Sequence, residues 1–112
     1  MTRPIPTSAE VSFDVMRALV AEGYQLKENE EDEVFTTAEA AWALVSDLDD
    51  AFVIFGKTLA PGPEPEGYEG WIRVILENGP VESLSDYTVN LEEIVDVDAL
   101  YARAEAAHPE LT

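Results

Sequence analysis

Hydrophobic residues recur at helical spacing near the start of the chain. Their positions three to four residues apart place them on one face of a helix. Thr7, followed by Glu10, has the spacing of a capping box, in which each end group satisfies a free backbone N–H. The pattern predicts a helix over residues 8–22. Its apolar face is formed by Val11, Val15 and Leu19.

The next segments alternate between charged turns and good helix formers. Residues 24–27 are predicted to be extended. Residues 28–33 are predicted to form a solvated turn, because five carboxylates in six residues repel one another. Thr36 and Glu39 then repeat the capping-box spacing before an alanine-rich run. We expect a second, shorter helix that ends near Asp47.

Short β-branched and aromatic runs predict the strands. Residues 51–55 are typical of a central strand with both faces covered. Residues 71–77 alternate between apolar and polar positions, and Asn78 with Gly79 predicts a tight turn into a partner strand over 81–89. Between them, the proline- and glycine-rich residues 59–67 are expected to form a surface loop.

A terminal helix completes the predicted order of elements. Asn90 and Asp96 are candidate caps, and Pro109 ends the apolar pattern. We therefore expect an α+β fold, in which helices pack on one face of a three- or four-stranded, mainly antiparallel sheet. Residues 1–112 are expected to form a single acidic domain.

Charge limits the partners of this chain. It holds 24 Asp and Glu against 6 Lys and Arg, a formal net charge of −18. Nucleic acid phosphates and anionic lipid would be repelled, which favours a basic protein as the partner. Hydrophobic residues nevertheless make up 46% of the sequence, enough for a folded core. No run approaches the ~20 apolar residues of a membrane span, so we expect a soluble protein. The absence of cysteine, and so of a disulfide framework, favours the cytoplasm.

The sequence offers little catalytic or metal-binding chemistry. Cysteine is absent and His108 is the single histidine, so the usual zinc and thiol chemistry lacks its ligands. A divalent-cation site over residues 47–52 is an alternative, but Ala51 and Phe52 stand where a calcium loop needs an oxygen ligand and a glycine. We predict a non-enzymatic protein with no cofactor, catalytic residue or metal site.

Acidic residues gather in two stretches that contain no Lys or Arg. Residues 28–50 hold nine carboxylates, and residues 82–98 hold six. Carboxylates at strand or helix spacing recur at roughly 5 to 7 Å, comparable with neighbouring phosphates. The alternative is that acidity serves only solubility. The predicted partner-binding residues are Glu28, Glu30, Glu31, Asp32, Glu33, Asp47, Asp49, Asp50, Glu92, Glu93, Asp96 and Asp98.

Two aromatic residues are further candidates for partner contacts. Tyr68 and Trp71 border the proline-rich loop, and either can anchor a partner. The alternative for Trp71 is that it covers the core beside Arg73. The sequence leaves both interpretations open.

Residues 70–79 and 85–92, with the sequences GWIRVILENG and SDYTVNLE, resemble small acidic accessory proteins of phages, plasmids and integrative elements. The resemblance implies mobile-element biology, in which acidic inhibitors that mimic DNA block basic surfaces of restriction or CRISPR nuclease complexes. The leading hypothesis is such an anti-restriction or anti-CRISPR inhibitor. The alternative is a structural or assembly module, acidic only for solubility, that binds through its aromatic surface as a homodimer.

Overall fold

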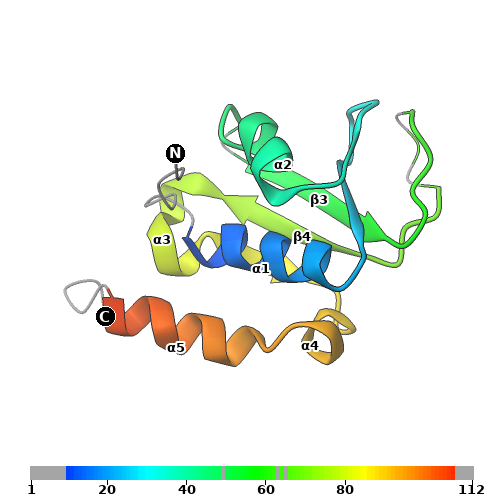
Figure 1. The fold of residues 1–112 in the computed structure, drawn as a ribbon. Helices are drawn as coiled ribbons and strands as arrows, with labels where there is room; N and C mark the ends of the chain where they lie inside the picture. The colour runs from blue at the N-terminus through cyan, green and yellow to red at the C-terminus, as the bar shows by residue number, and fades with distance from the viewer. Residues whose placement is uncertain (1–9, 49, 63, 65, 108–112) are drawn as a thin grey trace, which may run out of the picture.

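The computed structural model describes residues 10–48, 50–62, 64 and 66–107 (Figure 1). The predicted cap at Thr7, the predicted partner-binding residue Asp49 and His108 lie outside these residues. In chain order the elements are α1 (Glu10–Ala21), β1 (Gln25–Glu28), β2 (Val34–Phe35), α2 (Ala38–Val45), β3 (Asp50–Gly56), β4 (Gly70–Ile75), the 3₁₀ helix η1 (Leu76–Asn78), α3 (Gly79–Glu82), β5 (Leu84–Tyr87), α4 (Leu91–Ile94) and α5 (Val97–Ala107).

The strands form one antiparallel sheet in the order β2-β1-β3-β4-β5. The predicted α+β class is confirmed, and β3 occupies the predicted central position. The sheet has five strands rather than three or four. The additional strand is β2, where Phe35 pairs with Leu26 of β1. A strand of two residues gives no alternation for sequence analysis to detect.

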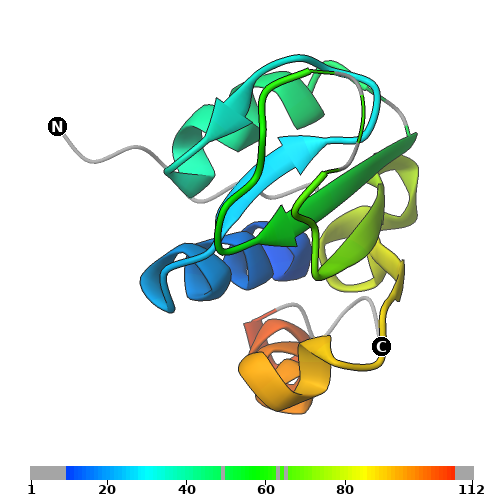
Figure 2. The same ribbon diagram turned by 90° about the vertical axis from the view of Figure 1, so that its right-hand side faces the viewer.

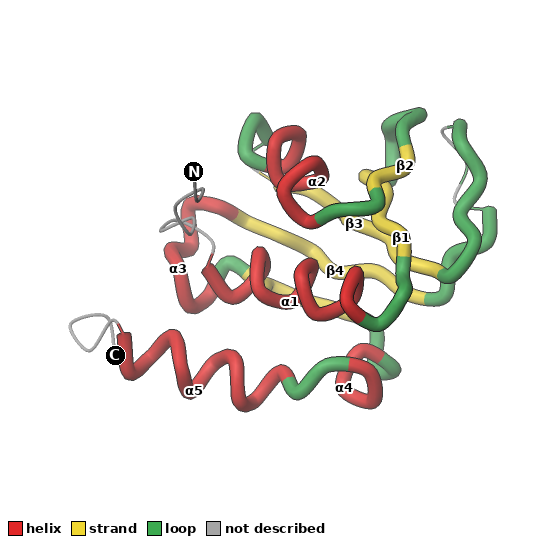
Figure 3. The backbone as a smooth tube through the Cα atoms, in the orientation of Figure 1, coloured by secondary structure: helices red, strands yellow, loops and turns green. Residues whose placement is uncertain are grey.

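The core lies between the sheet and the helices. α1 and α2 pack on one face of the sheet, and α5 packs against α1 on the side away from α2 (Figures 1, 2 and 3). The predicted apolar face of α1 is buried, with Val11, Val15 and Leu19 fully inaccessible to solvent. These side chains join Phe55 and Ile72 of the sheet in one hydrophobic cluster.

The face of the sheet opposite α1 and α2 is only partly covered. Strand pairing aligns Lys27 with Ile54, and Ile54 with Trp71, so these three side chains share this face. The 59–67 loop covers the part of this face around Lys27. The ammonium group of Lys27 donates hydrogen bonds to two carbonyl oxygens of the loop. Phe52 is 39% exposed. The prediction that both faces of residues 51–55 are covered is therefore wrong at Phe52.

Local geometry corrects three predicted turns and caps. Thr37, rather than Thr36, caps α2, and its hydroxyl accepts a hydrogen bond from the Ala40 N–H. Gly79 does have a positive φ of 91°, but η1 and α3 follow β4 in place of a tight hairpin turn. Asn90 does not cap α4 through its side chain, which donates instead to the Glu69 carbonyl. The predicted cap at Asp96 is present.

The described helices are also short. Within residues 10–48, 50–62, 64 and 66–107, no helix is long and apolar enough to cross a membrane.

Candidate functional site

The turn between β1 and β2 carries the densest group of exposed carboxylates. Glu30, Glu31, Asp32 and Glu33 are all exposed. They project from a turn that begins where Glu28 ends its pairing with Val53. The Glu31 N–H donates to the Glu28 carbonyl, which closes the turn. The predicted solvated turn is therefore confirmed over residues 29–33.

Glu28 does not belong to this exposed group. It is the last residue of β1 and is 7% exposed. Its carboxylate accepts a hydrogen bond of 2.9 Å from the Glu30 N–H and so organises the turn. The placement of Glu28 in a solvated turn is wrong, because strand pairing continues one residue further than its charge suggests.

The fold brings the turn next to the end of α2. Glu31, Glu33 and Asp47 line one shallow pocket of about 470 Å³, whose apolar lining includes Phe35 and Leu44. Asp47 follows α2 and is exposed. We name this site the acidic hairpin surface. It consists of Glu30, Glu31, Asp32, Glu33 and Asp47.

Asp50, although it was predicted to belong to the same acidic surface, is compensated by a positive charge. Its carboxylate receives two hydrogen bonds from Arg73, from Nε at 3.1 Å and from Nη2 at 2.7 Å. These bonds, together with the charge of Arg73, lower the pKa of Asp50 below its ordinary value. The lack of Lys and Arg within residues 28–50 therefore does not leave Asp50 uncompensated, because its partner comes from β4.

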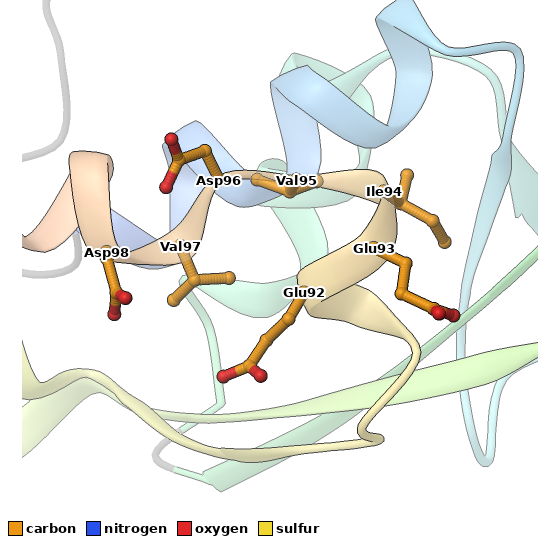
Figure 4. A pocket seen from close by; sticks show the side chains of 7 residues that line it. All are labelled: Glu92, Glu93, Ile94, Val95, Asp96, Val97 and Asp98. Carbon is orange, nitrogen blue, oxygen red and sulfur yellow. The ribbon is translucent and has the colours of Figure 1, made fainter.

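The second predicted stretch forms a separate pocket at the junction of α4 and α5. Glu92, Glu93, Asp96 and Asp98 all contribute to a cavity of about 360 Å³ (Figure 4). Figure 4 shows the carboxylates of Glu92 and Asp98 on one side of the chain, with that of Asp96 on the other. We name this site the junction pocket. Among the described residues, no group of three or more His, Asp or Glu side chains is arranged to hold a metal ion.

Two carboxylates of the junction pocket have internal hydrogen bonds. Asp96 accepts from the Ala99 N–H at 3.1 Å, which caps α5. Glu92 accepts from the Tyr87 hydroxyl at 2.8 Å, and this hydrogen bond is the main reason why the pKa of Tyr87 is raised to about 12. Because these interactions support the local fold, the junction pocket is the weaker candidate for binding a partner.

The two acidic regions do not form one continuous patch. The acidic hairpin surface adjoins α2, whereas the junction pocket lies at the start of α5, and α1 lies between these helices (Figures 1 and 2). A partner that covers both regions has to span α1. The acidic hairpin surface is therefore a separate candidate site.

Sequence reasoning missed the apolar residues that accompany the acids. Phe35 and Leu44 line the pocket beside Glu31 and Asp47. Their signal in the sequence is weak, because Phe35 after the acidic turn and Leu44 within an alanine-rich helix are each equally typical of a core edge. The chain matches no protein-family model, no curated protein and no solved structure.

Proposed function

We propose that this protein is a non-enzymatic inhibitor that binds a basic host protein through the acidic hairpin surface. In this role it acts in the cytoplasm as a nucleic-acid mimic and blocks a surface that otherwise holds DNA or RNA. The proposed biological setting is anti-CRISPR or anti-restriction activity on behalf of a mobile element. The observation that carries the proposal is the placement of the protein's own positive charges.

The lysine and arginine side chains of the described residues are committed elsewhere. Arg17 and Arg103 approach Asp14, and Arg73 pairs with Asp50. Lys27 and Lys57 donate to backbone carbonyl oxygens rather than to carboxylates. In the described part of the chain, no ion pair neutralises the acidic hairpin surface. Its negative field is therefore available to an external partner.

The geometry of the turn suits a basic binding surface. Consecutive exposed acids on a turn present several carboxylates at close spacing, as a nucleic acid backbone presents its phosphates. Such a field steers a positively charged partner and accelerates association. The neighbouring, partly exposed side chain of Leu44 adds apolar surface that can be desolvated on contact. The carboxylates of the turn and the apolar surface beside them together favour a protein partner over a small cation.

A capture experiment with a nucleic acid competitor tests the proposal. The immobilised protein is exposed to a host lysate, and retained proteins are eluted either with a salt gradient or with duplex DNA. We expect a basic nucleic-acid-binding protein to elute in both cases, because added ions screen the contact and DNA competes for the same surface. Reversing Glu30, Glu31 and Glu33 to lysine should abolish its retention.

A charge-matched variant serves as the control. Glu22, Glu77 and Glu105 are exposed glutamates outside the acidic hairpin surface, and their reversal to lysine changes the net charge equally. This variant should retain the partner with only a modest loss. Equal losses of partner retention in the two variants would show that net charge alone accounts for the binding. Elution by salt but not by DNA would contradict nucleic acid mimicry.

A further inference from the structure

A second feature lies beside the acidic hairpin surface, on the face of the sheet opposite α1 and α2. It is a mainly apolar pocket of about 350 Å³, lined by Asn29, Phe52, Ile54, Tyr68 and Trp71. The Phe52 and Trp71 rings form two of its walls, with centroids 5.5 Å apart and planes inclined at 68°. Tyr68 is 50% exposed. We name this site the aromatic pocket.

The pocket is built between the acidic turn and the proline-rich loop. The Asn29 N–H donates to the Phe52 carbonyl at 2.8 Å, which fixes the start of the turn against β3. The Gly62 N–H donates to the Asp32 carbonyl at 3.0 Å and joins the loop to the same turn. The buried ammonium group of Lys27 donates hydrogen bonds to the Ala60 and Glu64 carbonyl oxygens and so joins the loop to β1. The aromatic pocket and the acidic hairpin surface therefore share one structural support.

The pocket adjoins the acidic turn. Glu30 directly follows the pocket residue Asn29 and begins the run of exposed acids over residues 30–33. The buried Lys27 pairs with Ile54 on the same face, and its ammonium group is bound by two carbonyl oxygens. The guanidinium carbon of Arg73 lies 5.5 Å from the centroid of the Phe52 ring. Its charge is offset by the bidentate contact with Asp50. An incoming cation therefore meets aromatic walls next to the acidic turn at residues 30–33.

We infer that the aromatic pocket binds an arginine side chain of the basic partner and anchors it beside the acidic hairpin surface. The planar guanidinium is attracted to an aromatic face by a cation–π contact, the kind of contact that Arg73 makes with Phe52 at 5.5 Å. The methylene stem of the arginine covers apolar surface at Ile54 and Trp71. This inference rests on the proposed function and adds to it a chemical preference for arginine over lysine.

Other occupants fit the charges less well. A second copy of the chain would bring another −18 charge to the same face. Nucleic acid bases would carry their phosphates against the neighbouring acidic turn. A neutral apolar side chain would fill the pocket but gain nothing from the charge of that turn. Arginine fits both the aromatic walls and the neighbouring acidic turn.

Tryptophan fluorescence gives a direct test. The chain has two tryptophans, so Trp42→Phe leaves Trp71 as the single reporter inside the pocket. The probes are three peptides of alternating glycine with arginine, lysine or citrulline, the last being a neutral analogue of arginine. We expect saturable changes with the arginine peptide, about tenfold weaker binding of the lysine peptide and none of the citrulline peptide.

Variants of the pocket separate stacking from charge attraction. Tyr68→Ala and Phe52→Leu should each weaken binding of the arginine peptide several-fold, while leaving the lysine peptide nearly unaffected. Val89→Ala is the control, because Val89 is a hydrophobic side chain that is 82% exposed and lies outside the pocket. Thermal unfolding of each variant confirms that it is folded before the titration.

The outcomes distinguish this inference from the proposed function. Equal binding of the arginine and lysine peptides, or unchanged binding in both pocket variants, would overturn the arginine site. If lysine reversal of the acidic hairpin surface still abolished capture from lysate, the proposed function would stand without the arginine site. A doubled solution mass that Tyr68→Ala restores to that of a monomer would assign the pocket to a second copy and also overturn the inference.

Discussion

Lys27 Nζ donates a hydrogen bond of 2.6 Å to the carbonyl oxygen of Glu64, although the chain contains 24 carboxylates. A second hydrogen bond, of 3.0 Å, reaches the Ala60 carbonyl. Lys27 is fully buried. The lysine therefore joins β1 to the 59–67 loop, and it leaves the surface acids without compensation from its charge.

Lys27→Met tests this role in stability. Methionine retains a long apolar side chain but leaves the two carbonyl groups without their donor, so we expect a loss of about 1–3 kcal/mol in the free energy of unfolding. The loop should also become more sensitive to limited proteolysis. Lys57→Met is the matched control, because Lys57 is exposed. A loss that is equal in both variants would contradict a specific role for Lys27.

The contact between α1 and α5 depends on Asp14. Its side chain is 9% exposed and accepts a hydrogen bond of 2.7 Å from Arg103 of α5. Asp14→Asn should lower the free energy of unfolding by about 1–3 kcal/mol, because the buried group loses a charge-assisted hydrogen bond. Chemical denaturation measures the change.

The exposed Asp50–Arg73 pair provides the comparison for Asp14. Both side chains of this pair are more than a third exposed, at 44% and 39%. Solvent screens such a pair, so Asp50→Asn should cost less than Asp14→Asn. The reverse order of the two losses would show that burial does not decide the strength of these contacts.

Tyr87 links stability to alkaline pH. Its pKa is raised from 10.0 to about 12, first because its hydroxyl donates to Glu92 and then through burial. A raised pKa means that the neutral hydroxyl is favoured in the folded state. The resulting stabilisation is fully present below pH 10 and is lost as the pH rises through about 12.

Spectrophotometric titration of the tyrosinate absorbance checks the shift. Glu92→Gln should move the pKa of Tyr87 back toward its ordinary value, because the charged acceptor is gone. Tyr87→Phe identifies the signal of this residue by subtraction. An unchanged titration curve in Glu92→Gln would show that the hydrogen bond does not control the shift.

Salt should stabilise the fold. The net charge of −18 produces repulsion that dissolved ions screen, with a Debye length of ~10 Å at 0.1 M. We expect the melting temperature to rise between low and moderate sodium chloride. The rise should be smaller when Glu30, Glu31 and Glu33 are reversed to lysine. A melting temperature that is independent of salt in the unaltered protein would indicate that its carboxylates are well dispersed.

Local patterns determined much of this fold. Helical spacing located the buried face of α1, because i, i+4 contacts depend only on residues close in sequence. The aromatic run at residues 51–55 likewise predicted β3 as a central strand, and the alternation after Trp71 located β4. Prolines and glycines identified the 59–67 loop, since their backbone restrictions act at each residue.

The candidate site depended on contacts between distant residues. The sequence located the acids of the turn, but only the tertiary structure placed Asp47 beside Glu31 and paired Asp50 with Arg73. Strand pairing also decided that Phe52 meets Trp71 on the exposed face and that Lys27 is buried. Spacing along the chain reports which residues share an element. Which elements meet, and therefore which charges are neutralised, depends on packing across the whole sheet.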